Sequence, residues 1–370
     1  MIGGAAAALG PTWPTIGRAF AATDGPHGPY GPLGPIDRNG LKLPAGFSSR
    51  VIATTGQRVP GTNYRWHANP DGGATFAMRG GGWVYVSNSE VGSDGGVGMV
   101  RFSASGDIVE ARSILDGTDN NCAGGATPWG TWLSCEEVSD GRVWECDPTG
   151  ARRGVVRPAL GSFRHEAAAV DADRRHVYLT EDEGDGGLYR FVPDTWGDLS
   201  GGKLEVLTEA DDVFEWVRVP DPSARRDPCR YQVSSMKVFD GGEGLAYHGG
   251  VVYLSTKGDN RVWAYHVETQ TMSVLYEAPA SNPILSGVDN LTVTCCGDVL
   301  VAEDGGEMQI VAILADGTLK PLVQVEGHAG SEITGPAFGP SGTRLYFSSQ
   351  RSPGTNGLTF EVQGPFHLPV

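Results

Sequence analysis

The sequence predicts an all-β fold, a six-bladed β-propeller, from two observations. The chain has 370 residues, of which 55 are glycine and 24 are proline, a composition that favours many turns between short strands. Six similar strand-like segments also recur along the chain. They begin at Val84, Thr131, Val177, Val252, Val299 and Leu345, so that four of the five spacings are 46 or 47 residues. A period of this length, with several short strands in each unit, is typical of a propeller.

The N-terminal region is expected to lie outside the propeller. Residues 1–10 are small and apolar and Ala19-Phe20-Ala21 fits a cleavage site, so we interpret residues 1–22 as the remnant of a signal peptide. A disordered tail is the alternative. We expect a twin-arginine motif upstream and export to the periplasm or beyond. Residues 23–46 are rich in glycine and proline and predict an extended leader. No other segment approaches the ~18 apolar residues that cross a bilayer.

Residues 47–370 are predicted to form a single propeller domain. Blade one is expected to begin near Asn69. After most of the repeated segments, a turn separates two further alternating runs, which predicts four strands per blade. The one long spacing contains an insertion around residues 194–236, rich in Asp, Arg and Pro. Residues 360–365 are expected to return and close the ring.

Charge and cysteine usage exclude some classes of protein. The net charge of −16 disfavours nucleic acid as a partner, because phosphate backbones require basic patches. The excess acid suits either solubility or the binding of hard cations. The six cysteines form no CxxC pair, which disfavours a structural zinc site. Export would permit disulfides, and one interpretation pairs Cys135 with Cys146 across a hairpin.

Polar groups recur in two columns along the predicted blades. The first column stands at the start of each presumed innermost strand, where blade one offers His67 and Asn69. Its other members are Cys122, His165, Glu166, Glu243, Asp289, Asn290 and Glu332. The second column follows the repeated segments: Glu90, Glu136, Glu137, Glu181, Asp182, Lys257, Asp259, Glu303, Asp304, Gln350 and Arg351. Because neighbouring strands are antiparallel, both columns are expected at one mouth of the axial channel.

So many carboxylates at one mouth would repel one another strongly unless they were neutralised. Multivalent cations are the simplest means of neutralising them. Carboxylate, amide and carbonyl oxygens suit Ca²⁺, whereas a single thiolate among carboxylates suits a transition metal such as iron. The sequence therefore predicts a metal site on the axis.

The segment from Cys122 to Glu137, with the pattern CAGG-x-TPWGTWL-x-CEE, is long and specific. Together with VSNSE at 86–90, the Arg164-His165-Glu166 triplet and EITGPAF at 332–338, it resembles the PhoX-type alkaline phosphatases over roughly residues 45–360. The resemblance implies a six-bladed propeller with iron (Fe³⁺) and calcium on its axis. It also implies an exported enzyme that frees inorganic phosphate from small phosphate esters. We expect this enzyme to be a monomer.

Site residues follow from the same resemblance. It implies Cys122, Glu137, Glu166 and Glu243 as iron ligands. The candidates for calcium or its supporting shell are Glu90, Glu136, Glu181, Asp182, Asp289, Asn290, Asp304 and Glu332.

The chain also departs from the family. Gly241 stands where the larger members carry an arginine that contacts phosphate, and Arg351 stands where they carry a histidine. Arg164, Lys257 and Arg351 are therefore the candidates to supply the catalytic cation. Two alternatives remain open at this point. One is a calcium-dependent lactonase or phosphotriesterase-like propeller, which would not use a cysteine ligand, and the other is a non-catalytic metal-binding propeller.

Overall fold

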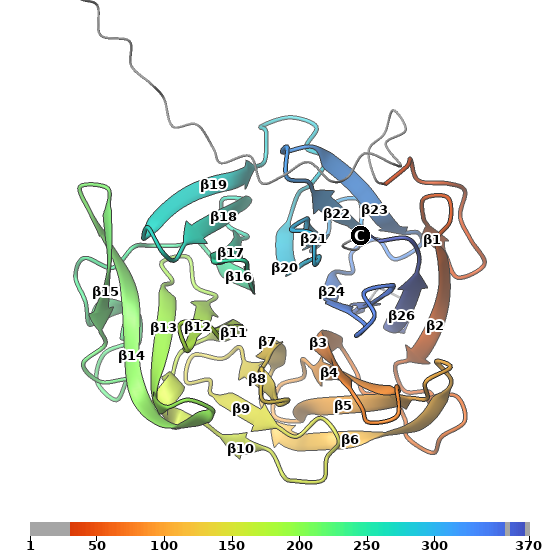
Figure 1. Cartoon of the computed structure of the whole chain (residues 1–370), viewed down its shortest axis with the longest axis horizontal. Coiled ribbons are helices and arrows are strands. Elements are labelled where there is room, and N and C mark those ends of the chain that lie inside the picture. Colours follow the sequence, from red (N-terminus) through yellow and green to blue (C-terminus); the bar gives the residue numbers. More distant parts are fainter. Residues whose placement is uncertain (1–29, 352–355, 367–370) are drawn as a thin grey trace, which may run out of the picture.

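The computed structural model describes residues 30–351 and 356–366, and these form six antiparallel sheets around a central axis (Figure 1). The predicted signal peptide, residues 1–22, and the first part of the predicted leader lie outside the described residues. One innermost strand from each sheet lines the axis. These strands are β3 (Pro70–Ala77), β7 (Asn121–Ala126), β11 (His165–Asp171), β16 (Gly242–His248), β20 (Val288–Val293) and β24 (Ile333–Phe338).

The six repeated segments are the second strands of the six blades, so the predicted propeller is confirmed. They are β4 (Trp83–Ser89), β8 (Trp132–Glu136), β12 (His176–Glu181), β17 (Val251–Thr256), β21 (Val299–Glu303) and β25 (Arg344–Ser349).

The third and fourth strands lie farther from the axis. They are β5 (Gly95–Phe102) and β6 (Ile108–Thr118), β9 (Val143–Cys146) and β10 (Val155–Val156), β13 (Leu188–Thr195) and β14 (Asp198–Ala210), β18 (Arg261–His266) and β19 (Thr271–Glu277), and β22 (Gln309–Ile313) and β23 (Leu319–Val325). Two blades exceed the predicted four strands. The short β1 (Leu41–Lys42) extends the fifth blade, and β15 (Val213–Arg218), from the predicted insertion, extends the third.

The ring closes through a strand that precedes blade one in the chain. Residues 360–365 were expected to close it, and β26 (Leu358–Gln363) is the third strand of the sixth blade. Its outer neighbour is β2 (Ser48–Thr54), with Val51 opposite Phe360. The sixth blade is therefore built from both ends of the chain, which ties the first and last blades together.

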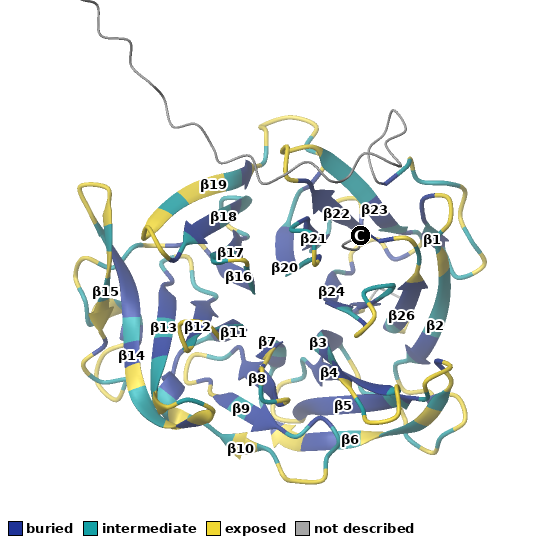
Figure 2. Cartoon of the chain, viewed as in Figure 1, coloured by how far each residue is buried: buried dark blue, intermediate teal, exposed yellow. Residues whose placement is uncertain are grey.

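Apolar side chains between the blades form the core, while exposed residues gather on loops and outer strands (Figure 2). Cys135 and Cys146 both lie in this core, and the predicted disulfide between them is wrong because both are free. Cys135 is opposite Val143, whereas Cys146 is opposite Trp132. Successive residues of a strand point to opposite faces, so the two thiols enter different core clusters. None of the described helices is long and apolar enough to cross a membrane.

Candidate metal centre

A β-bulge near the start of the inner strands turns side chains toward the axis. In blade one, Pro70 pairs with Ser89, and pairing resumes only at Gly73. The same interruption occurs in β7, β11, β16 and β20. A bulge leaves residues unpaired and re-aims their side chains. In these five strands, the second residue lies in the interrupted stretch: Asp71, Cys122, Glu166, Glu243 and Asp289.

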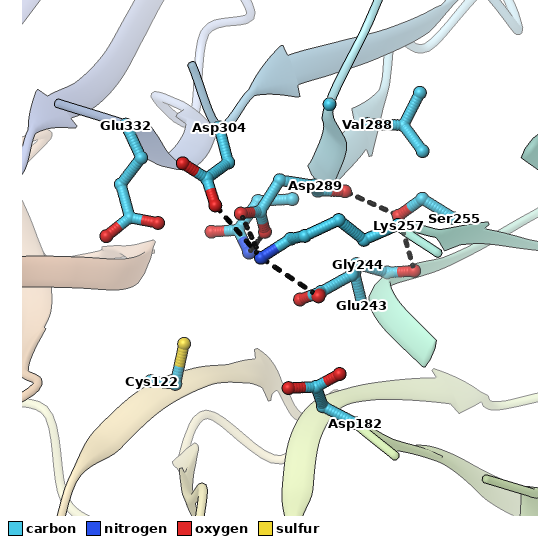
Figure 3. A network of polar contacts seen from close by, with 12 residues as sticks. Cys122, Asp182, Glu243, Gly244, Ser255, Lys257, Val288, Asp289, Asp304 and Glu332 are labelled. Atoms are coloured by element: carbon cyan, nitrogen blue, oxygen red, sulfur yellow. Dashed lines mark hydrogen bonds and ion pairs between the residues drawn. The ribbon is translucent and has the colours of Figure 1, made fainter. Parts of the chain in front are cut away.

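A second set of six residues lies near these five side chains. Each of the six directly follows the second strand of its blade. These six residues are Glu90, Glu137, Asp182, Lys257, Asp304 and Gln350. Within the described residues, ligand atoms from the two sets and from Glu332 approach to within 4.8 Å in four groups. The groups are Glu90–Cys122–Glu137, Asp71–Glu90–Glu332, Glu166–Glu243–Asp289 and Asp289–Asp304–Glu332. Figure 3 shows several of these side chains facing one common space.

Two of the predicted metal residues point away from this space. The carboxylate of Glu136 accepts hydrogen bonds from the backbone N–H groups of Asp119 and Arg142, each at 3.1 Å. Glu181 accepts one from the Tyr189 hydroxyl at 2.7 Å and pairs with Arg230 at 2.9 Å. The structure therefore does not bring Glu136 and Glu181 into the axial groups.

Asp182 and Asn290 lie beside the axial groups and contact their members. Asp182 is at the rim, where it contacts the side chain of Glu137 and lies 3.8 Å from the Nε atom of Arg164. The Asn290 amide donates a hydrogen bond to Oε1 of Glu166 at 3.4 Å and accepts one from the Gly335 N–H at 2.7 Å. Asn290 thus links inner strands of the third, fifth and sixth blades, and it holds one oxygen of Glu166 in place.

Asp71 belongs to the axial group but is not among the sequence-predicted residues. Strands β3 and β4, with 8 and 7 residues, are longer than the first and second strands of the other blades, so counting back from the repeated segment misses it. His67 and Asn69, which were expected in its place, are not members of the axial groups. Burial lowers the pKa of His67 to about 3, and the Asn69 amide donates to the backbone oxygen of Glu90 at 2.9 Å. The glycine pair after Asp71, which resembles the pair after Cys122, is the signal that would have found it.

The axial carboxyl groups are costly to ionise with only protein around them. Burial, followed by repulsion from neighbouring carboxylates, raises the pKa of Asp71, Glu166 and Glu243 well above the usual range. Burial with Asp182 nearby raises the pKa of Glu137 to about 8. Burial and the same carboxylates also raise the pKa of the Cys122 thiol, which donates to Oε1 of Glu166 at 3.3 Å.

The residues present fit a metal centre. The Oε2 atom of Glu166 is fully buried and has no hydrogen-bond partner among the described residues. A buried carboxylate oxygen without a partner is unfavourable unless it is protonated or bound to a cation. A bound polyvalent cation would stabilise the ionised carboxylates and the thiolate. Without the cation, these negative charges repel one another and the protonated forms are favoured. The donor set of one thiol and many carboxylates suits such ions.

All three predicted catalytic cations reach the axial groups from the mouth. Arg164 contacts Glu137 at 2.8 Å, and Arg351 contacts both Glu90 and Glu332 at 3.1 Å. Lys257 lies 3.0 Å from Glu243, 3.2 Å from Asp304 and 3.4 Å from Asp289. The exposed fractions of the Arg164, Lys257 and Arg351 side chains are 40, 36 and 55%. Solvent-accessible cations above buried acids are suited to receive an anion.

These features define a class of protein, a propeller with an acidic, thiol-containing site on its axis. Residues 92–246 match the model of the family described as alkaline phosphatase PhoX. The match confirms the resemblance seen in the sequence and includes Cys122, Glu137, Glu166 and Glu243. No curated protein matches the chain.

Solved structures share the fold. PhoX of Pseudomonas fluorescens in complex with vanadate, a transition state analogue, has a TM-score of 0.75 at 17% identity, over 90% of this chain and 97% of that chain. A gluconolactonase of Xanthomonas campestris reaches 0.54 at 15% identity, over 90% of this chain and 98% of that one. A Bacteroides thetaiotaomicron protein of unknown function reaches 0.55 at 10%, over 86% and 76%. The family match together with this fold supports a metal-dependent phosphatase, a phosphoric ester hydrolase, over a gluconolactonase.

Proposed function

We propose that this chain is an exported, metal-dependent phosphatase that releases inorganic phosphate from small phosphate esters. The observation that carries the proposal is Cys122, placed among buried carboxylates inside the segment that matches the family and below a rim of accessible cations. The single domain of residues 47–370, the signal peptide, the twin-arginine route and the monomeric state belong to the same proposal.

The two kinds of donor divide the centre between two metals. Iron would be held by the Cys122 thiolate with Glu137, Glu166 and Glu243, because a thiolate selects a transition metal. Calcium would be held by the group of Asp71, Glu90 and Glu332, in which every donor atom is an oxygen. When bound, such ions polarise phosphoryl oxygens and stabilise the negative charge of phosphoryl transfer.

The protein's own part at the mouth is to bind and orient the phosphate. Arg164 and Arg351 present guanidinium groups whose paired N–H donors match phosphate oxygens. Each is held by a carboxylate, Arg164 by Glu137 and Arg351 by Glu90 and Glu332, so the two groups are positioned before substrate arrives. Positioning of this kind lowers the entropic cost of reaching the reactive geometry.

The test is the metal content of protein purified without chelators, measured by elemental analysis, together with hydrolysis of p-nitrophenyl phosphate. We expect iron and calcium together, with turnover. Cys122→Ala should lose iron and activity, whereas Cys296→Ala, outside the axial groups on a turn between β20 and β21, should retain both. Protein that holds both metals and hydrolyses neither phosphomonoesters nor diesters would contradict the proposal.

A lactonase-like hydrolase is the second candidate, and the gluconolactonase fold is the observation that favours it. Its chemistry would use axial carboxylates and calcium without a thiolate. The Cys122→Ala variant separates the two candidates, because it would leave a lactonase active. Calcium bound without any turnover would instead favour a non-catalytic metal-binding propeller.

A further inference from the structure

Lys257 is the one cation in the set of six residues that follow the second strands, where four others are carboxylates and the sixth is Gln350. We propose that its ammonium group is a built-in counter-cation that fills the corner between Asp289 and Asp304. This chain would therefore bind one Ca²⁺ fewer at its axis than its acidic residues could hold. The inference rests on the proposed metal centre. It adds that one cation position of this centre is occupied by the protein's own ammonium group.

The geometry places the ammonium where a metal would find its ligands. Asp289, Asp304 and Glu332 form one of the four groups of converging ligand atoms. The Nζ atom of Lys257 lies 3.4 Å from Oδ2 of Asp289 and 3.2 Å from Oδ2 of Asp304, and it also contacts Glu243 at 3.0 Å. Figure 3 shows the lysine side chain crossing toward these three carboxylates, which come from two neighbouring blades.

Ammonium and calcium would compete for the same oxygens. Ca²⁺ requires six to eight oxygen ligands at about 2.3–2.6 Å. If Asp289 and Asp304 moved in to such distances, the ion would lie within a few ångströms of the lysine charge and be repelled by it. In four of the other five blades the residue at this position is a carboxylate. The lysine replaces that negative charge with a positive one. The remaining groups, which include Cys122, Glu137 and Glu90, have no contact with Lys257 and stay available to metal.

The backbone beside Lys257 favours this arrangement. The N–H of Lys257 donates to the carbonyl of Gly241 at 2.9 Å, and Gly241 has a φ of +70°. A Cβ atom at Gly241 would lie 3.4 Å from Oδ1 of Asp182 and 3.8 Å from Cβ of Lys257. A long side chain at position 241 would therefore emerge against the stem of the lysine. The glycine at position 241 therefore leaves this space free for the stem of the lysine.

The experiment counts calcium and does not depend on turnover. Lys257→Met and wild-type protein are loaded with Ca²⁺, freed of excess ion by gel filtration, and compared by elemental analysis and by calorimetric titration with CaCl₂. We expect one additional Ca²⁺ per chain in Lys257→Met. The matched control is Lys42→Met, because Lys42 pairs with Glu326 on the outer edge of the fifth blade. Its calcium count should equal that of wild type.

Two more variants keep the test decisive. Lys257→Arg retains a cation and should keep the wild-type calcium count. Lys257→Gln replaces the cation with a neutral polar group and should bind the additional Ca²⁺, so it serves as the test if Lys257→Met does not fold. An unchanged or lower count in folded Lys257→Met or Lys257→Gln would overturn the inference. Failure of the proposed function looks different: the wild-type protein would bind metal and hydrolyse no phosphate ester, while the extra calcium in Lys257→Met could still be counted.

Discussion

Removal of metal should make the stability of this protein fall as the pH rises, and the size of the effect follows from two carboxyl groups. Burial and neighbouring carboxylates raise the pKa of both Glu137 and Glu332 from 4.5 to about 8. Because the folded state then binds the proton more tightly than the unfolded state, stability is lost as the pH rises from about 4.5 through 8. The full loss is about 5 kcal/mol for each group, of which about 3 kcal/mol falls above pH 6.

The assay is urea unfolding of protein treated with a chelator, at several values between about pH 6 and pH 9, with and without added Ca²⁺. Calcium binds the ionised carboxylate of Glu332, so its presence should reduce the decline. Glu137→Gln should reduce the slope without calcium, whereas Glu326→Gln, a partly exposed acid on the outer edge, should leave it unchanged. Chelated protein whose stability stays constant or rises over this range would refute the reasoning.

Three further variants test the placement of individual side chains. Asp71→Asn should lower the calcium content while leaving the fold intact, because it removes one charge from the axial group; an unaltered metal count would contradict its assignment. Glu181→Gln should retain metal but lose about 1–3 kcal/mol of stability, because Arg230 loses its one fully buried partner and keeps only the more exposed Asp185 and Glu183. Loss of metal with normal stability would argue the reverse. Gly72→Ala should cost about 1–3 kcal/mol in denaturant unfolding, since a Cβ atom there would lie 2.5 Å from Cα of Ala123; unchanged stability would show that the neighbouring inner strands can separate.

Much of the architecture could be predicted because a propeller repeats itself. Each blade must present the same alternation of buried and exposed residues, so the second strands return at nearly constant spacing and are found by comparison with one another. The same repetition located Cys122, Glu166, Glu243 and Asp289 on the inner strands. From the residues alone, the ligands of this site could be predicted only as hard cations or a transition metal. The family resemblance then implied iron, calcium and the hydrolysis of phosphate esters.

Other features depended on local details that a repeat does not specify. The greater length of β3 and β4 displaced Asp71 from the expected position, and the closing strand β2 comes from before the first blade. Cys135 and Cys146 are close in sequence, yet their register on β8 and β9 places them on opposite faces. A shift of one residue along a strand reverses the face that a side chain occupies.

The sequence by itself determined that this chain is a six-bladed propeller with acids and one thiol at a common mouth. Only the tertiary structure decided which acids face the axis. Glu136 and Glu137 are adjacent and chemically identical, but the pleat of the strand sends the first into hydrogen bonds with the backbone and the second toward Cys122. Lys257 meets Asp289 and Asp304 only because the ring brings separate blades together. Composition and spacing record which groups are present, whereas strand register and ring closure set the distances on which ion binding depends.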